Sequence, residues 1–165
     1  MRLTARLDYP SADPLEVFTM LADPAFLART CEATGALSHE VDVAPGAGGA
    51  TVLTTVRELP TDRVPDLVRS LVGQTLTVRR VDTWRAAAAD GSRHGSVEVT
   101  IVGTPVSMSG TLSLAPAGAG AVETVDGELT ASVPLIGGRI AKAAEPALRA
   151  AIEVEQRVGT TWLTR

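Results

Sequence analysis

The sequence contains few of the residues that cross-link or fill the core of a small protein. It has one cysteine among 165 residues, Cys31, which excludes a disulfide within the chain and a cysteine-rich metal site. We expect Cys31 to be a small buried apolar residue and not a catalytic thiol, because free cysteines are usually buried. Aromatic residues make up 3% of the chain. The core must therefore be built mainly from valine, leucine, isoleucine and alanine.

The sequence also lacks a basic cluster, a targeting segment and a long apolar run. The formal net charge is -4, and Arg79 and Arg80 are the only adjacent basic pair. A nucleic-acid-binding surface would need more positive charge to neutralise phosphates. The first residues show no hydrophobic run typical of a signal peptide, and no stretch approaches the roughly 20 apolar residues that cross a bilayer. We therefore expect a cytoplasmic protein with no nucleic-acid partner and no integral membrane segment.

Motifs that carry catalytic chemistry are missing as well. We find no spacing typical of a metal-ligand cluster, no glycine-rich phosphate loop and no arrangement indicating a nucleophile triad. The sequence thus predicts no cofactor and no metal, and it favours a protein that is not an enzyme.

The most informative feature present is a long amphipathic helix near the carboxy terminus, between residues 134 and 163. Ile140, Ala144, Leu148 and Ile152 recur every four residues, and charged residues occupy much of the remaining surface. The apolar face is mostly alanine, which fills the space against a concave sheet poorly. We expect Pro146 to kink this helix, because proline removes one backbone hydrogen bond.

The rest of the chain reads mainly as strands with alternating apolar and polar residues. Two Asp-Pro steps, at residues 13–14 and 23–24, predict the starts of two short helices. A third short helix is expected over residues 64–71. Hairpin-length connections join the middle strands, which indicates an antiparallel meander. The predicted strands cover residues 2–9, 37–43, 51–59, 75–85, 96–101, 106–114 and 122–133.

This order of elements resembles the helix-grip fold of START-like proteins, the SRPBCC superfamily. The opening segment LDYPSADPLEVF, residues 7–18, is similar to the common start of that superfamily. The resemblance implies one α+β START-like domain over residues 1–165, with two short helices after the first strand and a curved antiparallel sheet of about seven strands around the long helix. An uncharacterised bacterial branch of the superfamily is similar in the segments DPAFL (23–27), CEATGA (31–36), VGTPV (102–106) and VPLIGG (133–138).

Polar residues on otherwise apolar strand faces are the candidate site residues. His39 lies in phase with Val41, so it is either a histidine of the core or rim satisfied by one hydrogen bond, or a polar group facing a cavity. Arg80 and Asp82 lie in phase with Trp84, and two inward charges are costly unless they pair or meet a polar ligand. Alternatively, a β-bulge reverses this phase and turns both charges outward.

Two other polar residues are expected to be solvated. Glu123 shares a face with apolar residues, but its place near a strand end predicts exposure to solvent. His94 lies in a polar hairpin beside residues 90–93 and is expected to be a solvated turn residue.

Three functional hypotheses follow. The first is a protein that binds or carries a small hydrophobic ligand, such as a lipid, isoprenoid or polyketide, between sheet and long helix. The second is an enzyme of the cyclase, aromatase or hydrolase kind, using His39, Arg80 and Asp82. The third is a non-catalytic interaction module with a filled core. For the first, the predicted ligand-binding residues are His39, Val41, Val78, Arg80, Trp84, Val99, Val106, Met108, Leu112, Leu129, Leu148 and Ile152.

Overall fold

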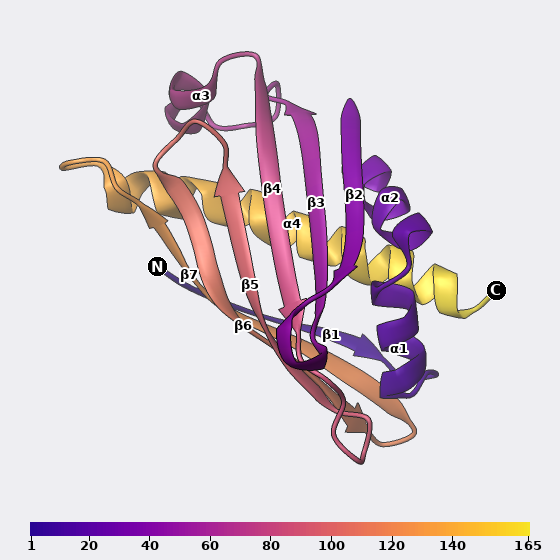
Figure 1. Cartoon of the computed structure of the whole chain (residues 1–165). Helices are drawn as coiled ribbons and strands as arrows, with labels where there is room; N and C mark the ends of the chain where they lie inside the picture. The colour runs from indigo at the N-terminus through magenta and orange to yellow at the C-terminus, as the bar shows by residue number, and fades with distance from the viewer.

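A curved seven-stranded antiparallel sheet wraps one long helix in the computed structural model, which describes residues 1–165 (Figure 1). The sheet order is β1-β7-β6-β5-β4-β3-β2, so every pair except β1–β7 joins strands consecutive in the chain. This confirms the α+β helix-grip arrangement expected from the sequence. The strands are β1 (Arg2–Tyr9), β2 (Ser38–Pro45), β3 (Thr51–Pro60), β4 (Thr75–Trp84), β5 (Arg93–Ile101), β6 (Val106–Ala117) and β7 (Gly120–Ala131).

Four α-helices accompany the sheet: α1 (Pro14–Leu21), α2 (Pro24–Ala33), α3 (Asp66–Val72) and α4 (Gly137–Leu163). A short 3₁₀ turn, Ala47–Gly49, joins β2 to β3. The two Asp-Pro steps act as predicted. The Asp13 carboxylate accepts a hydrogen bond from the amide of Glu16, and that of Asp23 accepts from the amide of Ala25. The first two helices therefore begin one residue after each aspartate.

Helix α4 crosses the concave side of the sheet from end to end (Figure 1). Its first turns lie at the end where α3 lies, and its last turns lie beside α1 and α2. The helix continues through Pro146 without interruption. The third helix begins at Asp66, two residues later than expected, because the backbone of Pro65 is still extended, with a ψ of 145°.

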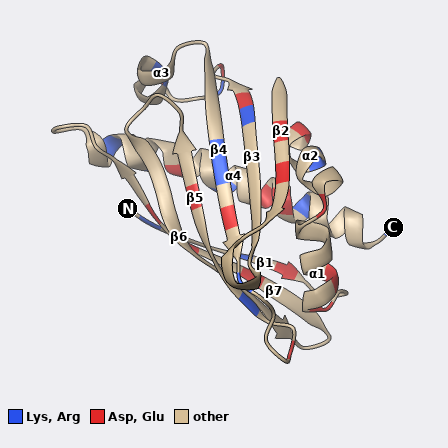
Figure 2. Ribbon diagram, in the orientation of Figure 1, with Lys and Arg blue, Asp and Glu red and all other residues tan.

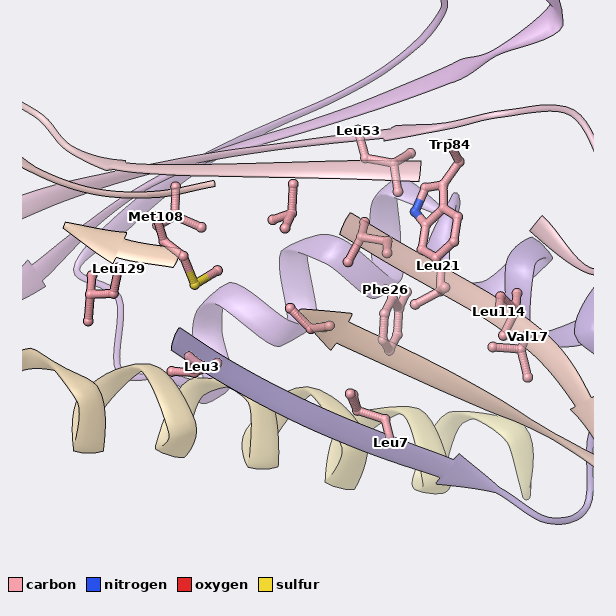
Figure 3. Packing of buried hydrophobic residues seen from close by; sticks show 14 of the residues in the cluster. Leu3, Leu7, Val17, Leu21, Phe26, Leu53, Trp84, Met108, Leu114 and Leu129 are labelled. Carbon is pink, nitrogen blue, oxygen red and sulfur yellow. The ribbon is translucent and has the colours of Figure 1, made fainter. Parts of the chain in front are cut away.

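The buried core fills the space between sheet and helices (Figure 3). Met108 and Leu129 lie toward one end of this core, and Trp84, Leu21 and Phe26 lie toward the other. Gly110 of β6 pairs directly with Gly127 of β7. A Cβ atom at Gly110 would collide with the backbone of β7, so glycine is required for the close approach of these two strands.

Charged residues of both signs are distributed over the molecule without a single-sign face (Figure 2). Basic and acidic positions follow each other along β4, in the middle of the sheet. No helix is both long enough and apolar enough to cross a membrane.

Candidate functional site: an apolar cavity beside a buried charge cluster

A cavity of about 160 Å³ lies between the sheet and α4. Strands β3 to β7 provide its floor, the segment that leads into α3 closes one side, and Ala144, Ala147, Leu148, Ala151 and Ile152 of α4 form its roof. Small alanine side chains on this face of the helix leave the space open. No aromatic residue lines the cavity, and most of its wall consists of aliphatic side chains.

At one end the cavity meets a buried cluster of charges centred on Arg80. The guanidinium donates from Nε to Asp82 Oδ1 at 2.9 Å and from Nη2 to Asp82 Oδ2 at 2.7 Å. Its Nη1 donates to Glu155 Oε2 at 2.7 Å. The ladder between β3 and β4 runs without a bulge, which turns both Arg80 and Asp82 inward. Burial disfavours the charge of Arg80, but Asp82 and Glu155 together outweigh burial and raise its pKa well above the usual range.

A second, polar chamber of about 30 Å³ lies beyond this cluster. Arg57, Arg80 and Ala151 border both hollows, so the two spaces adjoin. The chamber has room for about one or two water molecules. Side-chain atoms without a protein partner lie in its neighbourhood, namely Tyr9 Oη, Arg57 Nε, Trp84 Nε1 and Glu123 Oε2.

Glu123 is the most deeply buried acid of this chamber, with 1% of its surface exposed. Burial, and then the negative charge of Glu155, raises its pKa well above the usual range, so Glu123 favours the neutral acid. Burial likewise raises the pKa of the Tyr9 phenol. The expectation of a solvated Glu123 is therefore wrong. The sheet continues past it to Gly120, and α1 packs over this end.

Arg57 differs from Arg80 in having no acidic partner. It lies on the inner face of β3, in register with His39 of β2 and Val78 of β4. It donates one weak hydrogen bond from Nη1 to Thr34 Oγ1 at 3.4 Å, and its guanidinium interacts with the Cys31 thiol. Burial lowers the pKa of Arg57 and raises that of the neighbouring Cys31 thiol. Cys31 is 1% exposed, as expected of a buried apolar residue.

The structure brings most of the predicted ligand-binding residues to the apolar cavity. Val78, Arg80, Val99, Val106, Met108, Leu129, Leu148 and Ile152 line it.

Four predicted ligand-binding residues lie elsewhere. His39 and Val41 belong to β2, the edge strand, which α2 covers instead of α4. Trp84 lines the polar chamber and packs edge-on against Phe18 with ring centroids 6.2 Å apart. Leu112 is 1% exposed and lies in a filled part of the core.

The proposed catalytic trio is not assembled. Arg80 and Asp82 pair with each other, but His39 lies apart, with Nε2 3.9 Å from Glu32 Oε1 of α2. It lines neither hollow. His94 is exposed and lies within β5 instead of the turn. No group of three or more histidine, cysteine or acidic side chains is placed to hold a metal.

Two residues of the site were missed by the sequence reasoning although the sequence contains a signal for each. Arg57 alternates with Leu53, Thr55 and Leu59, so it shares their inward face. Glu155 lies four residues after Ala151 and three after Ile152, on the apolar stripe of α4. In both cases a charged residue in phase with a buried face was the signal that it belongs to the site.

Sequence comparison assigns the chain to a family. Residues 4–163 match the family described as protein of unknown function (DUF2505), and the chain belongs to it. Uncharacterized proteins Rv0481c of Mycobacterium tuberculosis and Mb0491c of Mycobacterium bovis are each 31% identical over 121 residues, which cover 72% of this chain and 69% of theirs.

Solved structures share the fold at low sequence identity. TTHA0849 from Thermus thermophilus superposes with a TM-score of 0.63 at 17% identity, covering 98% of this chain and 95% of that one. The di-domain ARO/CYC StfQ from the steffimycin biosynthetic pathway gives 0.62 at 12% identity, covering 97% of this chain and 50% of StfQ. A STAR-related lipid transfer protein fragment from Xanthomonas axonopodis gives a TM-score of 0.59 at 15% identity, covering 99% of this chain and 85% of that fragment. At these identities the likeness concerns the fold alone.

Proposed function

We propose that this member of the DUF2505 family is a START-like protein of the SRPBCC superfamily, one cytoplasmic domain over residues 1–165 that binds or carries a small hydrophobic molecule. The observation that carries the proposal is the aliphatic cavity between sheet and α4, closed at one end by a buried charge cluster. Apolar walls with a few placed polar groups are the usual design of a small-molecule site. The lipid transfer protein and the ARO/CYC protein with this fold are in keeping with the same class of ligand.

The cavity volume limits the size of the ligand. An engineered apolar cavity of about 150 Å³ in another protein binds benzene, and this cavity is of similar size at about 160 Å³. It therefore suits one ring or a short aliphatic chain. A cavity of this size also disfavours the third hypothesis, an interaction module with a filled core.

The polar groups favour binding over catalysis. Arg80 already donates three hydrogen bonds to two carboxylates, so it has little left to offer a reacting group. The chamber lined by Glu123 is too small for an organic substrate at about 30 Å³. His39, the residue best suited to move a proton at neutral pH, lies outside both hollows.

A substitution that fills the cavity tests the proposal. Ala144 is 7% exposed and lines the cavity, so we expect Ala144→Phe to occupy the space that the ligand needs. Ala150→Phe is the matched control, because Ala150 is exposed on the same helix and lines neither hollow.

Native mass spectrometry and thermal shift against a lipid extract provide the measurement. Wild type and Ala150→Phe should retain a small apolar molecule and gain thermal stability, and Ala144→Phe should do neither. Equal capture by Ala144→Phe and wild type, or no capture by wild type, would refute the proposal.

A further inference from the structure

We propose that the ligand of the cavity is an organic monocarboxylic acid whose carboxylate binds Arg57 while its apolar body occupies the space beneath α4. This inference rests on the proposed function and makes its ligand more specific. It starts from the difference between the two arginines that border the cavity.

Arg80 and Arg57 use their donors very differently. A guanidinium carries five N–H donors. Arg80 directs three of its hydrogen bonds to the carboxylates of Asp82 and Glu155. Arg57 makes one long hydrogen bond to Thr34, its Nε has no partner, and it forms no ion pair. Arg57 therefore keeps four of its five donors free, whereas Arg80 keeps two.

An uncompensated guanidinium in such a place is energetically unfavourable. Burial lowers the pKa of Arg57, which means that its surroundings disfavour the charge. The groups around it do not supply a counter-charge. The Cys31 thiol comes from α2, and Thr34 is the residue that follows this helix. His39 comes from β2 and Val78 from β4. The carboxylate whose charge acts on Arg57, Glu155 of α4, is held by Arg80 at 2.7 Å.

A carboxylate is the group that suits this arginine best. Its two oxygens accept two parallel hydrogen bonds from a guanidinium, and such charge-assisted pairs are about twice as strong as neutral ones. A single guanidinium balances one negative charge, which favours a monoanion over a phosphate dianion. A neutral alcohol would accept one hydrogen bond and leave the charge of Arg57 uncompensated.

The position of Arg57 also fits the orientation of the ligand. Arg57 borders both hollows, and Leu59 and Val78 continue from it along the wall of the apolar cavity. A carboxylate held there directs its chain toward Leu148 and Ile152 of α4. A short fatty acid or an aromatic acid with one ring matches both ends of the site.

Paired probes that differ only in the head group test this inference. Octanoate and octan-1-ol are titrated at pH 7.5 into wild type, Arg57→Gln and the control Arg79→Gln by calorimetry. Arg79 is exposed on the neighbouring strand and lines neither hollow. We expect wild type and Arg79→Gln to bind octanoate at least tenfold more tightly than octan-1-ol. In Arg57→Gln the preference should disappear, with octan-1-ol binding unchanged.

A second measurement uses wild type alone, in case Arg57→Gln does not fold. Octanoate affinity should fall several-fold between pH 7 and about pH 4, where carboxylates take up protons, while octan-1-ol affinity changes less than twofold.

The outcomes separate the two proposals. Equal binding of both probes by wild type, or a preference for octanoate that survives in a folded Arg57→Gln variant, would overturn the role of Arg57 and leave hydrophobic binding intact. Failure of wild type to bind either probe or any component of a lipid extract would remove the proposed function itself.

Discussion

The two ends of the concave face are filled in different ways. At the end of α1 and α2, the few aromatic residues gather. Phe18 packs on Trp84, and Phe26 packs on Trp162 with ring centroids 5.7 Å apart. At the end of α3, valines, leucines and alanines surround a hollow of about 160 Å³ without any aromatic ring. A sequence with so few large side chains can fill only one end of this sheet, and the other end becomes a binding space.

Between the two ends lies the charge cluster, and removing Arg80 should have the largest effect on stability. Arg80→Met leaves Asp82 and Glu155 buried without a counter-charge. We expect a loss of about 3–5 kcal/mol in the free energy of unfolding, measured in urea. Replacing all three residues by apolar ones should recover most of that loss. The exposed pair of Glu145 and Arg149 is the control, and Arg149→Met should cost less than about 1 kcal/mol.

Two leucine truncations compare the ends directly. Leu112→Ala opens a void in the filled core and should cost about 2–5 kcal/mol. Leu148→Ala only widens a hollow that already exists, so its cost should be about 1 kcal/mol. The free energies of unfolding of both variants are measured in urea. Equal losses would mean that the two regions do not differ in packing.

Replacing glycines of α4 by alanine compares the filled end and the hollow end by adding one methyl group at each. A Cβ atom at Gly159 would lie 2.8 Å from Cε1 of Tyr9 and 3.0 Å from Cε of Met20. Gly159→Ala should therefore destabilise the protein by about 1–3 kcal/mol. At Gly138, near the first turn of α4, an added Cβ atom would meet nothing within 4 Å. Gly138→Ala should be neutral or stabilising by about 0.5–1 kcal/mol. Thermal unfolding of both variants is the measurement. A destabilising Gly138→Ala together with a neutral Gly159→Ala would mean that α4 is packed more loosely at its C-terminal end.

Glu123 should also make the stability of the protein depend on pH. The folded protein holds a proton on Glu123 that the unfolded chain releases, so its raised pKa makes stability fall as pH rises above the usual glutamate value of 4.5. Glu123→Gln removes this titration. Relative to the variant, wild type should lose up to about 1.4 kcal/mol per pH unit through that window. Parallel stability curves from pH 5 to pH 8 would contradict the assignment.

The regular parts of the fold were predictable because they depend on local rules. Alternation along the strands and the Asp-Pro steps at Asp13 and Asp23 need no knowledge of distant residues. The site depends on which distant elements meet. His39 faces the concave side, as its phase indicates, but β2 is the edge strand and α2 covers it. Only the tertiary arrangement shows that Glu155 reaches Arg80 across 75 positions of the chain.

The pairing of β1 with β7, the one pair of strands that are not consecutive in the chain, affects the rate of folding. The register joins Tyr9 to Ala121 and Arg2 to Glu128, so β1 can pair with its neighbour only after the five intervening strands and β7 have been synthesised. Such distant pairing slows folding because a long loop must close first. Until then β1 carries unpaired backbone groups, and the concave face has no roof because α4 comes last. Nascent chains should therefore be most prone to aggregation after the apolar strands have been synthesised and before α4, their covering helix, has formed.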